Sequence, residues 1–458
     1  MTSNAFSSLP LPAEVLANLA ALDYQAMTPV QAGSLPLILA GRDVKAQAKT
    51  GSGKTAAFGI GLLQHLDPLA YRTQSLVVCP TRELADQVSK ALRLLARPLP
   101  NVKILTLCGG KPMGPQLSSL ERPPHVVVGT PGRLLKHCEK GSLKLGDVKT
   151  LVLDEADRML DMGFLDDIAT LLTFLPAQRQ TLLFSATYPQ EILAISESVQ
   201  NDPVEVRVES THDDSVIRQT LYETADGNRP AALATLLHRF RPDSSVVFCN
   251  RRQQCEELTG ELKRHGISAM ALHGDMEQKD RDRVLVMFAN RSMPVLIATD
   301  VAARGLDIKD LAAVVNYELP HDPQVYIHRI GRTGRAGSEG LALSLFSAGE
   351  MHRVQAIEAQ LGQALPTAAL PEIAADALPI KPVMTTLCLN AGRKAKLRPG
   401  DILGALTASG ELNREHIGKI DIFDREAYVA VTREQCGIAL ALLRDDGVKG
   451  RKILARKA

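Results

Sequence analysis

Short apolar runs alternate with amphipathic helical patterns over residues 1–360 of the chain. The apolar runs lie at 76–79, 126–128, 151–153, 181–184, 246–248, 295–297 and 313–315. Continuous apolar runs of this length predict strands that are buried on both faces. Helical periodicity marks the segments between them, including 82–97, 166–175, 252–265 and 278–290. Because strands and helices alternate, the pattern predicts two α/β units, each built on a parallel sheet with right-handed connections.

Changes in composition divide the chain further. The polar segment around Asn201–Pro203 ends the first α/β unit, and four prolines within 362–382 indicate a linker. The residues after this linker follow a β-α-β-β-α-β pattern. A chain of 458 residues predicts about three domains at roughly 150 residues each. The predicted division is 1–205, a connection at 206–216, 217–365, the linker 366–382, and a small α+β domain at 383–458.

No repeat of solenoid period is present, but the two large α/β units are candidates for a structural duplication. Composition places the whole chain among ordinary globular proteins, with 45% apolar and 23% charged residues. No stretch reaches the roughly 18 consecutive apolar residues that a membrane span requires, and the N-terminus lacks the pattern of a secretory signal. We therefore predict no membrane partner.

Cysteine usage and charge add two further expectations. The seven cysteines are an odd number without a C-x-x-C pair, which argues against a disulfide framework or a zinc site and predicts a cytoplasmic protein. Residues 381–458 hold 15 Lys and Arg against 9 Asp and Glu, whereas residues 1–380 hold 38 against 42. Positive charge is thus concentrated at the C-terminal end, where it favours a polyanionic partner; a solubilising tail is the alternative.

A glycine-rich loop, Ala48–Thr55, lies between the predicted strand 43–47 and the helical pattern 55–66. It has alanine where the plain phosphate-loop pattern begins with glycine. Its two glycines let backbone N–H groups close on phosphate oxygens, and the helix N-terminus adds its dipole. The lysine is predicted to reach the β- and γ-phosphates, and the threonine after it to ligate Mg²⁺. The predicted nucleotide contacts are Thr50, Gly51, Ser52, Gly53, Lys54 and Thr55.

Two adjacent carboxylates end a predicted strand about a hundred residues later. The run 151–153 leads directly into Asp154 and Glu155. Asp154 is predicted to hold Mg²⁺, and Glu155 to orient and deprotonate the attacking water. An acidic helix N-terminus stabilised by the dipole is the plain alternative. Together with the glycine-rich loop, this pair predicts an ATPase site.

The sequence Asp154-Glu155-Ala156-Asp157 is the one that names the DEAD-box RNA helicases, and the chain resembles that family over about residues 1–365. Its other motifs follow in order. They are Phe6, Tyr24 and Thr28–Gln31; Pro80–Ala85; Gly109-Gly110; Thr130–Arg133; Ser185–Thr187; Val247–Asn250; Gln278 to Arg281; Ala298–Asp307; and His328–Arg335.

The resemblance implies two tandem RecA-like parallel-sheet domains that close on ATP and single-stranded RNA. It implies that Tyr24 and Gln31 recognise adenine, and that Arg332 and Arg335 reach the transition-state phosphates from the second domain. Asp307 is implied to contact the ribose or one of these arginines. An arginine supplied in this way contributes on the order of 10³–10⁵ in rate, so hydrolysis is expected to depend on domain closure.

The same resemblance assigns RNA contacts and coupling residues. The RNA-contacting residues are Pro80, Thr81, Arg82, Gly109, Gly110, Thr130, Arg133, Asn250, Gln278, Arg281, Thr299 and Asp300, and the coupling residues are Ser185, Thr187 and His328. Side chains of these types and backbone donors contact phosphate and sugar rather than base edges. The helicase core is therefore expected to bind RNA with little sequence preference.

The element order of 383–458 is that of an RNA-recognition motif (RRM), but the aromatic RNP1 string is missing. Phe423 and Tyr428 are either core residues or a reduced stacking platform. A different surface is suggested by two basic clusters, which a solvated basic face would also explain. They comprise Arg393, Lys394, Lys396 and Arg398, and Lys449, Arg451, Lys452, Arg456 and Lys457. Phosphate contacts from both could hold a structured RNA by its shape.

The run Ala391–Leu406 resembles the C-terminal module of the DbpA subfamily of bacterial DEAD-box proteins. That resemblance implies a tethered domain that grips a hairpin of large-subunit (23S) ribosomal RNA and presents nearby duplex to the helicase core. The implied role is maturation of the pre-50S particle by a monomer. Two alternatives stay open: an ATP-gated RNA clamp, and a general RNA chaperone without ribosomal RNA specificity.

Overall fold

The computed structural model describes residues 4–48, 51–208, 217–303, 311–334, 339–372, 378–445 and 447–458. These residues form two compact units, one containing the first predicted domain and the other the second and third. No helix in the described ranges is long and apolar enough to cross a bilayer. The predicted fold class is confirmed: two parallel α/β domains are followed by a small antiparallel α+β domain.

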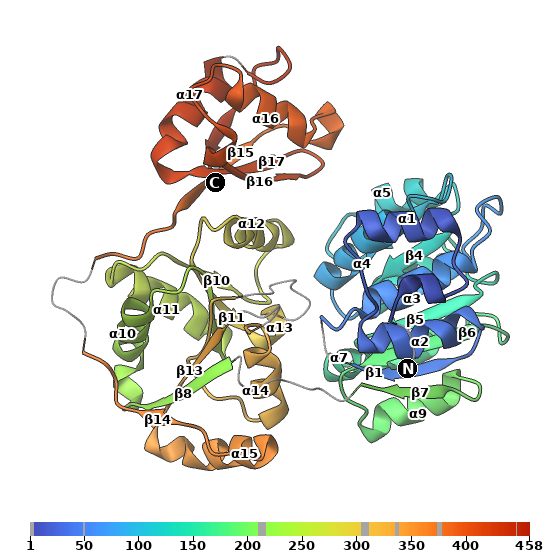
Figure 1. Ribbon diagram of the computed structural model, residues 1–458, viewed down its shortest axis with the longest axis horizontal. Helices are drawn as coiled ribbons and strands as arrows, with labels where there is room; N and C mark the ends of the chain where they lie inside the picture. The colour runs from blue at the N-terminus through green and yellow to red at the C-terminus, as the bar shows by residue number, and fades with distance from the viewer. Residues whose placement is uncertain are drawn as a thin grey trace. The chain divides into compact units, whose positions relative to one another are not determined.

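The first domain is built on a seven-stranded parallel sheet in the order β3-β4-β2-β5-β6-β1-β7 (Figure 1). Its strands are β1 (Val44–Gln47), β2 (Ser75–Val78), β3 (Ile104–Leu107), β4 (Val126–Gly129), β5 (Thr150–Asp154), β6 (Gln180–Ser185) and β7 (Val204–Arg207). Its α-helices are α1 (Ala13–Ala21), α2 (Pro29–Leu39), α3 (Lys54–Gln64), α4 (Arg82–Leu95), α5 (Met113–Leu120), α6 (Pro131–Glu139), α7 (Ala156–Asp161), α8 (Leu165–Leu172) and α9 (Gln190–Val199).

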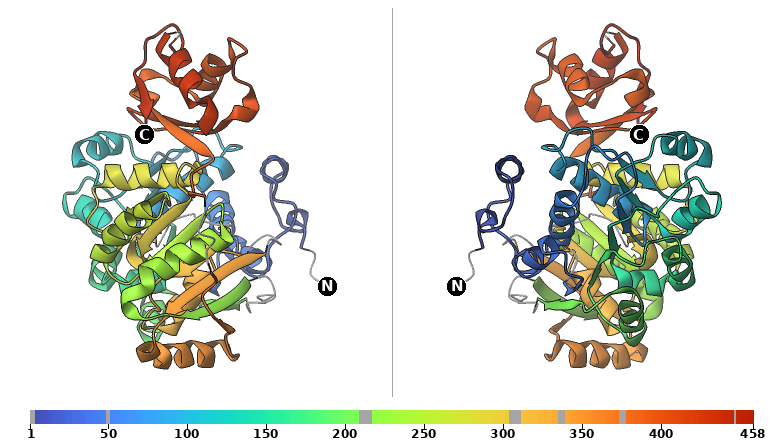
Figure 2. Two further views of the ribbon diagram at one scale, coloured as in Figure 1. Left: turned by 90° about the vertical axis from the view of Figure 1, so that its left-hand side faces the viewer. Right: turned by 90° about the vertical axis from the view of Figure 1, so that its right-hand side faces the viewer.

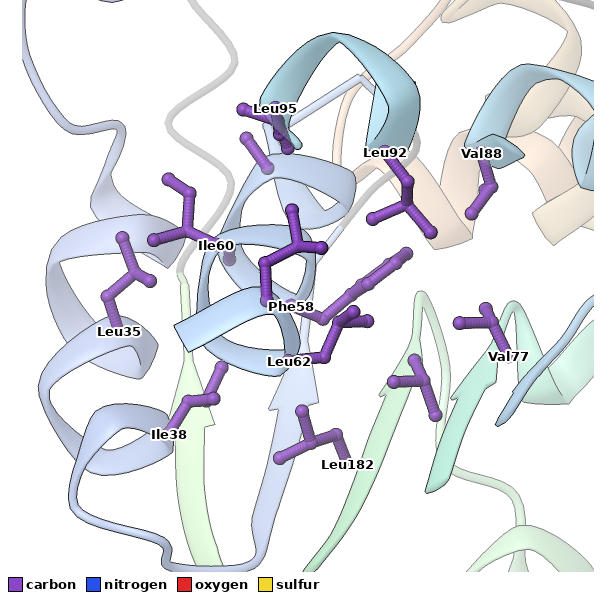
Figure 3. Close-up of a cluster of buried hydrophobic side chains, with 14 of the residues drawn as sticks. Leu35, Ile38, Phe58, Ile60, Leu62, Val77, Val88, Leu92, Leu95 and Leu182 are labelled. Atoms are coloured by element: carbon purple, nitrogen blue, oxygen red, sulfur yellow. The ribbon is translucent and has the colours of Figure 1, made fainter. Parts of the chain in front are cut away.

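Alternate strand residues of this sheet enter two separate cores. Val77 and Val152 pack in the core that α2, α3 and α4 cover, whereas Leu76 and Leu151 pack in the core beneath α6 to α9. Burial on both faces explains why these strands have continuous apolar sequences. Figure 3 shows α3 enclosed by neighbouring side chains. A Cβ on its Gly61 would lie 2.2 Å from Ile38 of α2, so glycine permits this close approach.

The second domain repeats the same architecture. Its seven-stranded parallel sheet has the order β10-β11-β9-β12-β13-β8-β14, which is the first order with every strand number raised by seven. The strands are β8 (Ile217–Glu223), β9 (Ser245–Cys249), β10 (Ala269–Leu272), β11 (Val295–Thr299), β12 (Ala313–Asn316), β13 (Gly340–Phe346) and β14 (Thr367–Ala368). The α-helices are α10 (Arg229–Phe240), α11 (Arg252–Arg264), α12 (Gln278–Ala289), α13 (Asp300–Ala303), α14 (Pro323–Ile330) and α15 (Met351–Leu361). The identical strand order supports the predicted duplication.

The third domain is a four-stranded antiparallel sheet in the order β16-β17-β15-β18. Its elements are β15 (Met384–Leu389), α16 (Pro399–Thr407), β16 (Ile417–Ile422), β17 (Ala427–Thr432), α17 (Cys436–Asp445) and β18 (Ala455–Lys457). Both helices lie on the same side of the sheet (Figures 1 and 2). The β-α-β-β-α-β pattern read from the sequence is therefore present.

Short 3₁₀ turns complete the described elements. They are Phe6–Ser8, Asp226–Asn228, Ala348–Glu350, Arg393–Ala395, Arg414–His416 and Arg433–Gln435. Two predicted boundaries differ from the structure. Strand β7 runs to Arg207, past the predicted end of the first domain at 205, because its backbone pairs with β1. Within the predicted linker 366–382, β14 pairs with β8 and Ile380 bridges to Ile267, so parts of this segment belong to the second domain.

Candidate nucleotide and RNA sites

The glycine-rich loop crosses from the carboxyl end of β1 to the N-terminus of α3. Gly51 and Gly53 have φ values of +88° and +94°, which favour glycine. A Cβ on Gly53 would also lie 2.5 Å from Gln31 Nε2. Lys54 begins α3 and is 6% exposed, and its Nζ has no hydrogen-bond partner among the described residues. The predicted contact Thr50 lies outside the described residues.

Gln31 joins the predicted adenine-recognition segment to this loop. Its Nε2 donates to the Gly53 carbonyl at 3.1 Å, and its Oε1 accepts from the Thr28 N–H at 2.9 Å. Tyr24 packs edge-on against Phe6, with ring centroids 6.2 Å apart, and burial raises the pKa of the Tyr24 hydroxyl. The structure thus brings the phosphate loop and Gln31 into direct contact.

Asp154 and Glu155 end β5 and are both buried. Burial, with a smaller contribution from the Glu155 charge, raises the pKa of Asp154 to about 6, although the Lys54 charge opposes that rise. Asp154 Oδ1 has no hydrogen-bond partner in the described part of the chain. Glu155 adopts a left-handed conformation, φ +54°, and its Oε2 accepts from Arg158 Nη1 at 2.7 Å. Sequence reasoning did not single out Arg158.

Buried polar atoms without partners are expensive unless a ligand satisfies them. Lys54 Nζ and Asp154 Oδ1 are two such atoms within the described residues, one cationic and one anionic. A phosphate group would satisfy the first, and a hard divalent cation the second. Thr55 and Asp154 both offer oxygen, the ligand that Mg²⁺ prefers. These residues therefore fit a magnesium nucleotide.

Asp157, the last residue of the DEAD sequence, is hydrogen bonded to the predicted coupling motif Ser185–Thr187. Asp157 Oδ2 accepts from the Ala186 and Thr187 N–H groups at 3.2 and 3.1 Å, and from the Thr187 hydroxyl at 3.2 Å. In return, Ser185 Oγ accepts from the Asp157 N–H at 3.1 Å. No role for Asp157 was predicted from the sequence, but β5 and β6 are neighbouring strands, so their carboxyl ends meet. Hydrogen bonds of Asp157 thus connect the DEAD sequence to Ser185 and Thr187, whose coupling role stays a prediction.

The predicted RNA-contacting segments of the first domain follow three adjacent strands. Pro80–Arg82 follows β2, Gly109-Gly110 follows β3, and Thr130–Arg133 follows β4, and the sheet order is β3-β4-β2. The Arg82 guanidinium lies against Gly110, where a Cβ would stand 1.9 Å from Nη1. Thr81 Oγ1 accepts from the Leu84 N–H and so caps α4. The strand order therefore gathers these segments at one edge.

In the second domain, predicted RNA contacts surround a buried arginine. Arg329, 2% exposed, donates to both carboxylate oxygens of Asp300 at 2.7 Å and to Asn250 Oδ1 at 2.9 Å. It also donates to Asn316 Oδ1 and to the Glu318 carbonyl, and lies 5.0 Å from the centroid of the Phe248 ring. Asn250 and Asp300 thus have a structural role as acceptors for the buried Arg329 guanidinium. Their predicted RNA contacts stay predictions.

The other predicted residues of the second domain lie in α12, at the end of β11, in α14 and just after α14. Gln278 Nε2 donates to Asp282 at 2.9 Å, and Arg281 Nη1 donates to the His273 carbonyl at 3.2 Å. Thr299 ends β11, and His328 lies in α14. Arg332 follows α14 and is 8% exposed. Arg335 and Asp307 fall outside the described residues, so their predicted roles stay predictions.

The two basic clusters of the third domain are adjacent, as the topology predicted. Lys449 Nζ lies 2.8 Å from Asp401 Oδ2 and donates to the Lys396 carbonyl at 3.4 Å. The predicted contacts Arg393, Lys394, Lys396 and Arg398 lie before α16, and Lys449, Arg451 and Lys452 lie between α17 and β18. Asp401 therefore helps hold one cluster beside the other.

The sheet face of the third domain is not a stacking platform in this structure. Tyr428 is 5% exposed and packs with Cys388 and with Val286 of α12, and Phe423 packs edge-on against it at 5.6 Å. Beside this contact, Thr386 Oγ1 is hydrogen bonded to Ser292 Oγ at 2.6 Å. Tyr428 is thus buried and Phe423 is partly buried, in a small cluster with Val286 and outside the third domain's main core, which leaves little room for base stacking on Tyr428.

Comparison with known proteins gives three family matches. Residues 28–195 match the family model described as DEAD/DEAH box helicase, and residues 228–337 match the helicase conserved C-terminal domain. Residues 386–457 match the DbpA RNA binding domain.

Individual relatives cover the same regions. The chain is 53% identical to ATP-dependent RNA helicase DbpA of Escherichia coli over 453 residues, 99% of each protein. It is 41% identical to the DEAD-box ATP-dependent RNA helicase CshA of Bacillus subtilis over 354 residues, 77% of this chain and 72% of that protein. The structure of Saccharomyces cerevisiae Dbp5 bound to RNA and ADP BeF3 matches 80% of this chain and 96% of that one, with a TM-score of 0.74 and 30% identity.

Proposed function

Because this chain belongs to the DEAD-box family of ATP-dependent RNA helicases, we propose that it opens short duplexes of large-subunit ribosomal RNA during assembly of the large subunit. In this proposal RNA-stimulated ATP hydrolysis drives local opening, and the third domain grips a 23S ribosomal RNA hairpin. The protein acts as a cytoplasmic monomer. Its seven cysteines, all described, are free and buried, which is consistent with a reducing compartment.

The observation that carries the ribosomal target is the third domain. It matches the DbpA RNA binding domain, and its Lys396 and Lys449 clusters are joined through Asp401. Tyr428 on its sheet is buried and Phe423 is partly buried, which favours recognition of RNA shape through phosphate contacts over base stacking. The contact between this domain and α12 places the basic clusters in the same compact unit as Gln278 and Arg281.

Within the first domain, the proposed chemistry is divided among three buried groups. The glycine-rich loop and Lys54 bind the phosphates, and Glu155 takes the proton of the attacking water. Mg²⁺, when bound through Asp154 and Thr55, neutralises phosphate charge. Arg158 orients the Glu155 carboxylate through their ion pair. Because Arg158 holds the Glu155 carboxylate before substrate arrives, this carboxylate needs little reorganisation.

The second domain supplies the remaining groups in this proposal. Arg332 and Arg335 stabilise the charge that develops on the transferred phosphoryl group, so neither domain alone holds the full catalytic set. RNA bound by both domains favours their closure, and hydrolysis is therefore RNA-stimulated. Asp157 connects the carboxylates to Ser185 and Thr187, which links nucleotide state to the RNA-facing edge.

The target is tested by comparing RNAs. ATP turnover should rise far more with ribosomal RNA that carries the cognate hairpin than with unrelated RNA of equal length, and deletion of 383–458 should remove that difference. Equal stimulation by both RNAs would indicate a general RNA chaperone. A strand-displacement assay separates unwinding from clamping. The variant E155Q should bind ATP and RNA without hydrolysis, and unaltered turnover would refute the role of Glu155.

A further inference from the structure

A buried side-chain amide outside the family motifs connects two of the predicted RNA-contacting segments. Gln116 of α5 is 7% exposed. Its Nε2 donates at 3.1 Å to the carbonyl of Cys108, the residue immediately before Gly109-Gly110. Its Oε1 accepts from Arg133 Nη1 at 2.9 Å. One amide therefore holds both the glycine loop after β3 and the arginine after β4.

A third partner fixes the orientation of this amide. His137 Nε2 lies 2.9 Å from Gln116 Oε1, and its Nδ1 lies 2.9 Å from the Ser142 hydroxyl. His137 is fully buried, and burial, with the nearby Arg133 charge, lowers its pKa. Because the amide oxygen Gln116 Oε1 can only accept, His137 Nε2 is the donor in this contact. The Cys108 carbonyl needs an N–H, whereas Arg133 and His137 need an acceptor. A single orientation of the Gln116 amide satisfies all three.

Further contacts extend this arrangement across the predicted RNA-facing edge. Arg133 Nη1 donates a second hydrogen bond to the Lys111 carbonyl at 2.9 Å, so the glycine loop is held on both sides. The Arg82 guanidinium lies against Gly110. Arg82, the loop 109–111 and Arg133 are thus fixed relative to one another, with Gln116 as the buried connection behind them.

We propose that Gln116 is a positioning residue for RNA: it sets the spacing between Arg133 and the Gly109-Gly110 loop that a single-stranded RNA backbone contacts. The proposal rests on the proposed RNA-facing role of these segments. Gln116 is buried and all three of its described bonds are internal, so it acts through Arg133 and the loop. Preorganised groups lose less conformational freedom when a ligand binds, which strengthens binding.

The variant Q116M keeps the length of the side chain and removes its hydrogen bonds. Q116E keeps the acceptor for Arg133 and His137 and removes the donor to Cys108. The matched control is Q74M. Gln74 is 1% exposed, donates to the Asp67 and Ala70 carbonyls, and accepts from the Asp67 N–H. It also has three amide hydrogen bonds, but it lies before the amino end of β2, at the opposite edge of the sheet.

The experiment measures ATPase activity of the full chain against the concentration of a single-stranded oligoribonucleotide. We expect Q116M to raise the half-saturating RNA concentration about tenfold, the effect of losing one charge-assisted hydrogen bond. The KM for ATP and the turnover at saturating RNA should stay within twofold. Q116E should recover part of the loss, and Q74M should lower the melting temperature without changing the half-saturating RNA concentration.

Each other result has a defined meaning. If Q116M leaves the half-saturating concentration within twofold while R133A raises it, the inference about Gln116 is overturned and the RNA role of Arg133 stands. If R133A has no effect either, the proposed RNA-facing role itself fails. An equal rise in Q74M would reduce the effect to general destabilisation. If Q116M does not fold, the partial loss expected of Q116E decides, and wild-type behaviour of Q116E refutes the proposal.

Discussion

Replacement of Arg329 by lysine tests the buried network of the second domain. The guanidinium makes five hydrogen bonds, two to Asp300 and one each to Asn250, Asn316 and the Glu318 carbonyl. Lysine keeps the charge but offers three N–H donors on one nitrogen, without the planar fork. At least two of the five acceptor contacts must therefore be lost in R329K.

The size of the effect follows from the burial of these groups. Each buried acceptor left without a partner costs about 1–3 kcal/mol, so two cost about 2–6 kcal/mol. That is a large part of the roughly 5–15 kcal/mol that stabilises a whole domain. Arg329 also lies over the Phe248 ring, and this contact contributes in the same direction. We expect the opening free energy of the second domain to fall by at least about 2 kcal/mol.

Native-state hydrogen exchange measures that quantity domain by domain, which a single melting temperature of a multidomain chain does not. Amides of β9, β11 and β12 should exchange at least about 30-fold faster in R329K, since 1.4 kcal/mol corresponds to a factor of ten. Amides of β5 serve as the internal control. The exposed R264K, whose partner Glu261 lies one turn away, should change exchange less than threefold. An acceleration below fivefold in R329K would refute the network argument.

Three further predictions concern the nucleotide loop and the third domain. The pKa of Asp154 is raised to about 6 in the folded protein, so the nucleotide-free first domain should gain stability as the pH falls from 7 toward 4. The Mg²⁺-dependent nucleotide affinity, measured by calorimetry, should instead fall below pH 6. In D154N this affinity should no longer depend on pH in that range. G53A should abolish nucleotide binding and destabilise the first domain by about 1–3 kcal/mol, because Gly53 has a φ of +94° and a Cβ there would meet Gln31. The control is G114A, whose Cβ would meet nothing within 4 Å. It should be neutral or stabilising in the same thermal and binding assays. K449A should weaken binding of the ribosomal RNA hairpin and reduce the salt slope of its affinity by about one, whereas an unchanged slope would place Lys449 off the RNA.

Strands buried on both faces were predictable, and strands at the margins were not. The runs that become β2, β4, β5, β9, β11 and β12 are continuously apolar because helices cover both sides. The marginal β7 alternates apolar and charged residues, Val204 to Arg207, since one side faces solvent. Its four residues carry too little periodicity to separate a strand from a loop. Pairing with β1 decides its structure, and that partner is distant in sequence.

In the candidate site, likewise, the motif residues were predictable from the sequence, whereas the residues that contact and hold them were not. Glycine spacing and the paired carboxylates predict Lys54, Asp154 and Glu155 from the sequence, because phosphate favours a cation and Mg²⁺ favours carboxylate oxygens. The residues that hold them are set by packing. Arg158 offered one local signal, a cation three residues after Glu155, which is one helical turn. Gln116 offered none, because its partners follow two different strands.

At the positions equivalent to the predicted nucleotide site of the first sheet, the second sheet carries different residues. By strand order β8 is the counterpart of β1, yet the residues after it, 224–228, contain no Gly-x-Gly-Lys sequence. β12 is the counterpart of β5 and ends in Asn316 where β5 ends in Asp154. Instead of a carboxylate pair for a metal ion, this position accepts a hydrogen bond from Arg329.

The hydrogen-bond network around Arg329 also bears on Arg332, the second arginine of the motif His328–Arg335. The Arg332 N–H donates to the Arg329 carbonyl at 3.2 Å, so the network that occupies the carboxyl edge of the second sheet also fixes the turn that carries Arg332. In the proposed mechanism, the second domain has no phosphate loop of its own and contributes Arg332 to the nucleotide site of the first domain. It follows that one nucleotide should bind per chain, and that K54A should remove all of it; residual stoichiometric binding in K54A would mean that the second edge still holds a phosphate site.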